Sequence, residues 1–145
     1  MTEQQKCSDL PSVQLSDGNW LQHMLASQNE FQSSLSGNFN DLALSEERLT
    51  AQSDSPLQDF AQAMSYNILA SHAELTELLE WIPWKNWKTY GPMTEEQVME
   101  ARYEAIDILH FLFNMMMLLG MDAQMIYDLF MRKQQENRNR QKRGY

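Results

Sequence analysis

Apolar residues recur along this chain at the spacing expected of helices. Over 19–35 they lie at roughly helical intervals, and Ser36-Gly37-Asn38 then provides an end for this helix. The apolar positions are Trp20, Leu21, Met24, Leu25, Phe31 and Leu35. A weaker pattern over 41–52 predicts a short helix. Residues 1–18 are polar and predict a loose, flexible N-terminal arm.

Two long helices carry start signals in the second half of the chain. Ser55-Pro56-Leu57-Gln58 places a Ser N-cap before a Pro at the first helical position, with Gln completing a capping box. That helix should end near Trp81, before Pro83. Thr94-Glu95-Glu96-Gln97 starts a helix that should end near Gly120, and Asp122 caps a final helix. We therefore expect an all-α fold, a bundle of four to five helices, with one helical domain over 19–131.

Composition supports this fold and limits the compartment. The 145 residues suffice for one domain, or for one subunit that completes its core with a partner. A single cysteine, Cys7, excludes an internal disulfide and suits a reducing compartment. No signal peptide is apparent in the first twenty residues, and the apolar stretch from Ile106 to Met121 is interrupted by polar residues and too short to cross a bilayer. We expect a soluble cytoplasmic protein with no membrane partner.

Charge is distributed unevenly. Residues 132–145 carry six basic side chains against one acid, a local charge of +5, which leaves −14 on the rest of a chain whose net charge is −9. The acidic body argues against a nucleic-acid partner, because such binding rests on neutralising phosphates. The basic tail is either a phosphate-binding segment for a small polyphosphate or a solvated terminal helix.

Two pairs of acids have the spacing of metal ligands. Glu74 and Glu77 lie three residues apart on one predicted helix, as do Glu104 and Asp107 on the next. Residues three apart share a helix face, so each pair can offer four carboxylate oxygens to one divalent ion. If the helices are antiparallel, all four acids face one another, which is costly without cations. This pattern predicts a Mg²⁺ enzyme.

The segment between the acidic helices combines aromatic and basic side chains. Trp84, Lys85, Trp87 and Lys88 alternate on a loop beside the acids. Such a loop could stack on a base and neutralise phosphate. The alternative is that Trp84 and Trp87 anchor the loop on the core.

These motifs together resemble a known family. The resemblance is carried by Glu74-Leu75-Thr76-Glu77-Leu78, Pro83-Trp84-Lys85-Asn86-Trp87-Lys88, Glu104 to Phe111, Asn114, Lys133, Asn137, Arg140-Gln141 and Gly144-Tyr145. In order and spacing they resemble the all-α NTP pyrophosphatases, specifically the dimeric dUTPases and the related bacteriophage dCTP/dUTP pyrophosphatases. Compared with the larger members of this family, the chain is short.

The resemblance implies a reaction and a cofactor. Water attack at the α-phosphorus would convert a deoxypyrimidine nucleoside triphosphate to its monophosphate and pyrophosphate. Glu74, Glu77, Glu104 and Asp107 match the family's Mg²⁺ ligands, with two or more ions per site, and either Glu74 or Glu77 would be the general base. The resemblance also implies a homodimer, in the host cytoplasm if the origin is viral.

The resemblance also implies substrate contacts. The segment 132–145 matches a terminal motif that closes over the phosphates through Lys133, Asn137, Arg140 and Tyr145. Gln28 would meet the pyrimidine edge, and since an amide can flip, it does not by itself separate uracil from cytosine. His110 and Asn114 would line the nucleoside pocket. Alternatively, His110 is a core histidine and Asn114 bonds to another helix.

The function hypothesis is a Mg²⁺-dependent diphosphatase that acts on dUTP alone or on both dUTP and dCTP. Within the enzyme class, the alternatives are a dCTP-specific pyrophosphatase and a MazG-like enzyme with another base preference. A di-iron bundle would need a Glu-x-x-His motif on two helices, and only Asp107-x-x-His110 is comparable. A non-catalytic helical interaction protein with a Met-rich surface at 115–117 is the alternative of another class.

Overall fold

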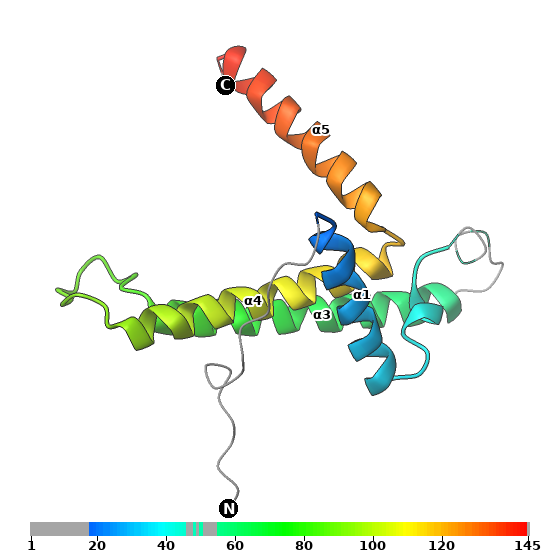
Figure 1. Ribbon diagram of the computed structural model, residues 1–145, viewed down its shortest axis with the longest axis horizontal. Coiled ribbons are helices and arrows are strands. Elements are labelled where there is room, and N and C mark those ends of the chain that lie inside the picture. The colour runs from blue at the N-terminus through cyan, green and yellow to red at the C-terminus, as the bar shows by residue number, and fades with distance from the viewer. Residues whose placement is uncertain (1–17, 46–47, 49, 51–54, 145) are drawn as a thin grey trace, which may run out of the picture.

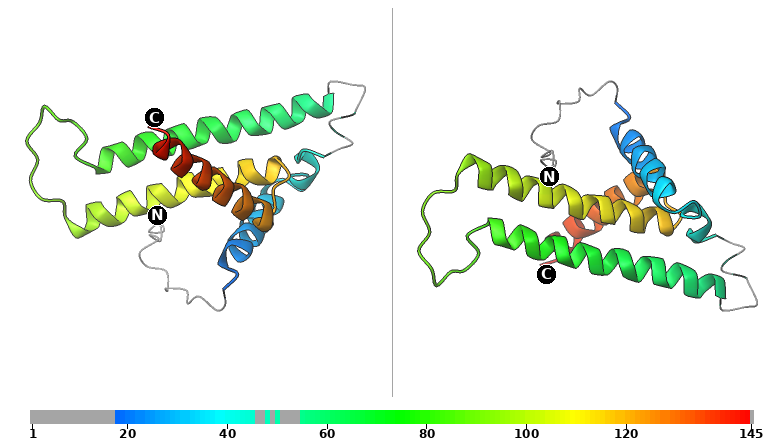
Figure 2. Two further views of the ribbon diagram at one scale, coloured as in Figure 1. Left: turned by 90° about the horizontal axis from the view of Figure 1, so that it is seen from above. Right: turned by 90° about the horizontal axis from the view of Figure 1, so that it is seen from below.

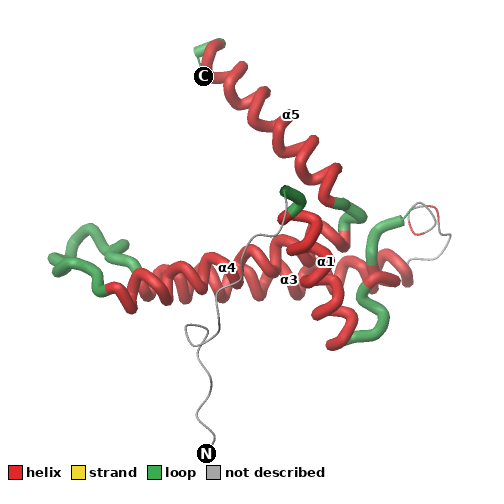
Figure 3. The backbone as a smooth tube through the Cα atoms, in the orientation of Figure 1, coloured by secondary structure: helices red, strands yellow, loops and turns green. Residues whose placement is uncertain are grey.

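The chain folds into helices joined by loops (Figures 1 and 3). The computed structural model describes residues 18–45, 48, 50 and 55–144. In this part of the chain there is no strand, and the elements are α1 (Trp20–Leu35), the 3-10 helix η2 (Asn40–Leu42), α3 (Ser55–Trp81), α4 (Glu95–Leu118) and α5 (Ala123–Lys142). The prediction of an all-α fold is confirmed. Most of the expected N-terminal arm, and Tyr145, lie outside the described residues.

An antiparallel hairpin of α3 and α4 forms the long body of the molecule (Figure 2). The predicted capping box starts α4: the Gln97 amide donates to Thr94 Oγ1 at 3.2 Å, and the Thr94 amide donates to Gln97 Oε1 at 2.9 Å. The α3 helix ends at Trp81, as predicted, and begins at Ser55 itself, one residue earlier than an N-cap role for Ser55 implies. These local signals place the end of α3 and the start of α4.

A glycine turn separates α4 from α5. Gly120 has φ 73°, and its amide donates to Met117 O at 2.9 Å while the Met121 amide donates to Met116 O at 3.0 Å, the two bonds of a Schellman motif. Asp122 then caps α5 by accepting from the Met125 amide at 2.8 Å. Within the described residues no single helix is long and apolar enough to cross a membrane; α4 and α5 reach that length and hydropathy only jointly, across a bend of 104°.

The buried core lies where α1 crosses the hairpin. Its apolar side chains come from α1, the segment beside η2 and the C-terminal half of α4: Leu25, Phe39, Phe113 and Leu118. The Leu44 amide donates to Leu118 O at 2.6 Å and ties the segment after η2 to the end of α4. The short helix predicted over 41–52 is not continuous, because this extended segment, 43–45, separates η2 from helical residues 48 and 50. Residues 46, 47, 49 and 51–54 lie outside the described part. Docking on α4 outweighs the weak helical pattern.

Several helices keep apolar faces exposed. α4 packs on α3, α1 and η2, as expected of a central helix, yet its Ile106 and Leu112 remain exposed. On α3 an exposed stripe follows one face through Ile68, Leu75 and Leu79. α5 leads away from the hairpin (Figure 1), and none of its described residues is buried. The single chain therefore buries only part of its apolar surface.

Replacing Gly120 tests the turn after α4. A Cβ at this position would lie 2.9 Å from the carbonyl oxygen of Leu44, and φ is +73°. We expect Gly120→Ala to lower the free energy of unfolding by about 1–3 kcal/mol, measured by urea denaturation. Gly91→Ala is the control, because a Cβ there meets open space. Equal unfolding midpoints for both variants and the wild type would contradict this role of Gly120.

Candidate metal and nucleotide site

Three glutamates meet on the facing sides of the hairpin. Glu74 and Glu77 come from α3 and Glu104 from α4, and each offers an oxygen within 4.8 Å of the others. Two of them are half-buried and Glu77 is exposed, so the cluster is open to solvent on one side. Clustered carboxylate oxygens are the hard donors that Mg²⁺ prefers. We call these three residues the acidic cluster.

Burial and mutual repulsion act on this cluster. Burial is the largest cause that raises the pKa of Glu74, followed by repulsion from Glu77, Asp107 and Glu104. Burial likewise raises the pKa of Glu104, although the indole Nε1–H of Trp81, 3.3 Å from Glu104 Oε1, lowers it in part. Both carboxylates resist ionisation more than an ordinary glutamate. A bound cation would offset this cost.

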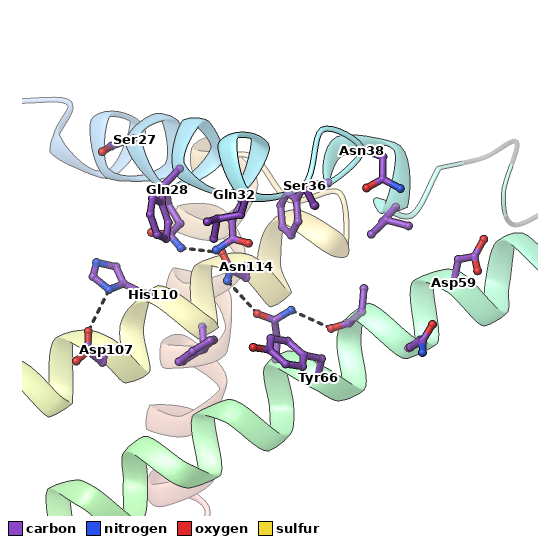
Figure 4. Close-up of a pocket in the computed structure, with 18 of the residues that line it drawn as sticks. Ser27, Gln28, Gln32, Ser36, Asn38, Asp59, Tyr66, Asp107, His110 and Asn114 are labelled. Carbon is purple, nitrogen blue, oxygen red and sulfur yellow. Dashed lines mark hydrogen bonds and ion pairs between the residues drawn. The ribbon is translucent and has the colours of Figure 1, made fainter.

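Asp107, the fourth predicted ligand, is placed beside the cluster but outside it. It is close enough to raise the pKa of Glu74 and Glu104, yet its Oδ1 lies 3.4 Å from His110 Nδ1, one turn further along α4. Both side chains are half exposed and border the same cavity (Figure 4). Asp107 thus joins the acidic cluster to that cavity.

The cavity is bounded by α1, η2, α3 and α4 and has a volume of about 1220 Å³. One side reaches Glu74 and Asp107, and the walls include aromatic rings from three helices, Phe31, Tyr66 and Phe111. Polar side chains from α1 and α4, among them Gln28 and Asn114, point into the space between these helices (Figure 4). A cavity with apolar walls and a few polar groups is typical of a small-molecule site.

A chain of three buried amides closes the floor of this cavity. Gln28 Nε2 donates to Asn114 Oδ1 at 2.9 Å, and Asn114 Nδ2 donates to Asn67 Oδ1 at 2.9 Å. Asn67 Nδ2 then donates to the backbone oxygen of Ala63 at 2.8 Å. The exposed fractions are 8%, 2% and 5% for Gln28, Asn114 and Asn67. In this structure Asn114 therefore finds its partners on other helices, as one of the two sequence-based alternatives proposed.

Two buried polar residues of α3 were missed from sequence. Asn67 lies seven residues and Ser71 three residues before Glu74, so both share the face of α3 that carries Glu74. Ser71 is buried, and its Oγ has no hydrogen-bond partner among the described residues. Extending the helical spacing backward from Glu74 would have found both. Their partners on other helices could not be read from the sequence.

The loop after α3 presents its aromatic rings to solvent. Trp84 is 48% and Trp87 70% exposed, and their rings meet edge to face with centroids 5.7 Å apart. Lys85 Nζ lies 5.3 Å from the centre of the Trp84 ring. The alternative that Trp84 and Trp87 anchor the loop on the core is wrong for this chain, because both rings are exposed. Lys88, on the same loop, is exposed.

The predicted tail residues lie on α5, away from the acidic cluster. Lys133 and Asn137 are exposed, and Arg140 pairs with Glu136 on its own helix at 3.2 Å. α5 leads away from the hairpin (Figure 1), so the single chain does not bring these residues to the carboxylates. Tyr145 lies outside the described residues.

Comparisons with known proteins assign the family. Residues 21–119, more than half of the chain, match the family described as dUTPase. Two curated relatives, from Enterobacteria phage T4 and Enterobacteria phage LZ5, are each described as "dCTP pyrophosphatase"; each is 42% identical over 53 residues, 37% of this chain and 31% of the relative. The match thus covers less than a third of each relative, and no solved structure matches. The family resemblance noted from the motifs is confirmed: the chain belongs to the dUTPase family.

Proposed function

We propose that this protein is a Mg²⁺-dependent diphosphatase that converts dUTP to dUMP and pyrophosphate, with dCTP as a second substrate. The observation that carries the proposal is the acidic cluster, three carboxylates within 4.8 Å of one another at the edge of a cavity of about 1220 Å³. The family description supports the first base and the names of the phage relatives support the second. The cavity is large enough to take a nucleoside.

Carboxylates of the hairpin would hold the metal. Glu74, Glu77 and Glu104 would hold it, and Asp107, which now faces His110, would be the fourth ligand. When bound, Mg²⁺ supplies charge neutralisation for the triphosphate and lowers the pKa of the attacking water. Glu74 or Glu77 would accept a proton from the water that attacks the α-phosphorus, and the bond from that phosphorus to the α,β-bridging oxygen would break to release pyrophosphate. The Trp81 indole holds Glu104 in place by its hydrogen bond.

The substrate would lie along the hairpin. The base and sugar occupy the cavity, where Gln28 and His110 are available, and the reacting phosphate lies at the acidic cluster. The remaining phosphates would point along the hairpin toward the ammonium groups of Lys85 and Lys88. The basic tail supplies further phosphate contacts through Arg140.

A homodimer accounts for the exposed surfaces. The stripe of Ile68, Leu75 and Leu79 on α3 and the exposed apolar residues of α5 need a partner, and a second copy of the chain can supply it. In such a dimer α5 of one copy can approach the acidic cluster of the other. We propose that Lys133, Asn137 and Arg140 act on the partner's site.

The other hypotheses have less support. A di-iron bundle would use histidine ligands, and the one such cluster among the described residues contains glutamates alone. A non-catalytic interaction protein would leave the acidic cluster and the loop with Trp84, Lys85, Trp87 and Lys88 unexplained. A MazG-like enzyme with another base preference would share the acidic cluster, so only a substrate panel separates it from the proposal.

A substrate panel tests the reaction. Release of pyrophosphate and monophosphate is measured with dUTP, dCTP, dTTP, dATP, dGTP and the ribonucleotides, in Mg²⁺ and in EDTA. We expect Mg²⁺-dependent turnover of dUTP, or of dUTP and dCTP, and a fall in kcat of about 100-fold or more in Glu104→Gln. Glu80→Gln, an exposed acid on the same helix as Glu77, is the control and should retain activity. Turnover of purine nucleotides only, or none, would refute the proposal.

The raised pKa values predict how Mg²⁺ stabilisation depends on pH. Because the folded-state pKa of Glu74 and Glu104 lies above the ordinary value of 4.5, metal-free protein loses stability as pH rises through the raised values. Mg²⁺ should therefore raise the Tm at neutral pH and lose this effect below pH 4.5, where protons occupy the carboxylates. Thermal melts with Mg²⁺ or EDTA across this range measure it. An equal increase in Tm at both ends would contradict binding at these glutamates.

Mixed dimers test whether the tail acts on the partner. Dimers of Glu104→Gln and dimers of Arg140→Ala are each expected to be poorly active. A hybrid dimer contains one chain of each variant. If Arg140 acts across the interface, one of the two sites in the hybrid has both Glu104 and Arg140 intact. Equal mixing after reversible unfolding should then restore about a quarter of wild-type activity. No recovery, with hybrid formation confirmed by mass spectrometry, would place Arg140 in its own chain's site. A monomer by light scattering would exclude the dimer itself.

A further inference from the structure

The polarity of the buried amide chain is fixed at one end. The backbone oxygen of Ala63 can only accept, so the side chain of Asn67 must turn its Nδ2 toward it. Asn67 Oδ1 then faces Asn114, which must donate, and Asn114 Oδ1 in turn faces the donating Nε2 of Gln28. Each hydrogen bond allows only one orientation of the next amide. The backbone oxygen of Ala63 on α3 thus fixes the orientations of Asn67 on α3, Asn114 on α4 and Gln28 on α1 in turn.

Reversing any one amide would be costly. If Gln28 flipped, its Oε1 would face Asn114 Oδ1 at about the present 2.9 Å, bringing together two acceptors in a buried place. Flipping Asn114 as well would only move the conflict to Asn67, and flipping Asn67 would set its oxygen against that of Ala63. The free amide edge of Gln28, at the cavity, is therefore held with Oε1 as its acceptor. A Gln28 side chain without these hydrogen bonds could present either orientation to a ligand. Bonded to Asn114 and, through it, to Asn67, Gln28 has one orientation.

We propose that Asn67 is a positioning residue that fixes the orientation of Gln28 and thereby sets the base preference of the site. The inference rests on the proposed function, since it assumes that a pyrimidine occupies the cavity. Uracil presents N3–H as a donor with acceptors on both sides, whereas cytosine presents N3 as an acceptor beside a donor amine. An amide whose oxygen and nitrogen are fixed in place pairs with uracil only when the base lies in one position, and with cytosine only when the base lies in another. Such an amide cannot bind both bases equally well in one pocket. An amide free to flip could.

The test compares the binding of dUMP and dCMP by calorimetry in EDTA, which needs no turnover. The variants are Asn67→Asp, measured at a pH where its carboxylate is ionised and cannot donate to Ala63, and the control Gln62→Glu, which makes the same change of charge on the same helix at the same cavity. In the wild type and the control we expect the two Kd values to differ by about tenfold or more. In Asn67→Asp the ratio should move toward one. Asn67→Ser, which no longer reaches Asn114, should do the same if Asn67→Asp fails to fold.

The possible outcomes are distinct. The role of Asn67 is overturned if the ratio of the dUMP and dCMP Kd values is unchanged in the Asn67 variants, or if it changes equally in Gln62→Glu. Equal Kd values for dUMP and dCMP in the wild type overturn it as well. Glu74→Gln separates this inference from the proposed function, because it should remove hydrolysis and leave the dUMP-to-dCMP ratio intact. A protein that shows the predicted ratios without hydrolysing any nucleotide would refute the reaction and keep the base-binding role. Binding of neither nucleotide would overturn the role of Asn67, and the substrate panel in Mg²⁺ would still decide the reaction.

Discussion

The structure depends on the antiparallel packing of α3 against α4. This packing brings Glu74, Glu77 and Glu104 within 4.8 Å of one another, with Asp107 next to them. Burial and like charge raise the pKa of Glu74 and Glu104, so the cluster works against the hairpin that carries it. Carboxylates that destabilise the helix pair carrying them are candidates for a functional role. A bound divalent cation would turn this repulsion into attraction.

The same hairpin arranges the rest of the site in order along its length. The exposed Trp84 and the half-buried Lys85 lie at one end, the acidic cluster follows, and the cavity lies where α1 crosses the other end. α1 is tied to the hairpin by the Gln28–Asn114 hydrogen bond as well as by apolar packing. Buried polar groups that hydrogen-bond to one another specify one arrangement of helices more strictly than apolar contacts do. The hydrogen bonds that form the cavity floor therefore also hold α1 against the hairpin.

Local signals in the sequence predicted the elements well. The Thr94 capping box, the Asp122 cap and the Gly120 turn involve residues within a few positions of one another, and all three occur in the structure. The acidic pairs were predictable because helical spacing alone puts their members on one face. Asn67 and the exposure of Trp87 were not, because they depend on which helices meet. The direction of α5 depends on the bend after α4 and on surfaces that a single chain leaves uncovered.

The central claim is that the acidic cluster holds divalent metal. The most direct measurement is the anomalous scattering of a crystal of the full chain grown with Mn²⁺ in place of Mg²⁺. The account predicts at least one anomalous peak between Glu74, Glu77 and Glu104, within about 2.0–2.3 Å of their oxygens. Full-strength peaks elsewhere, or none near these carboxylates at a Mn²⁺ concentration that saturates the protein in solution, would contradict it.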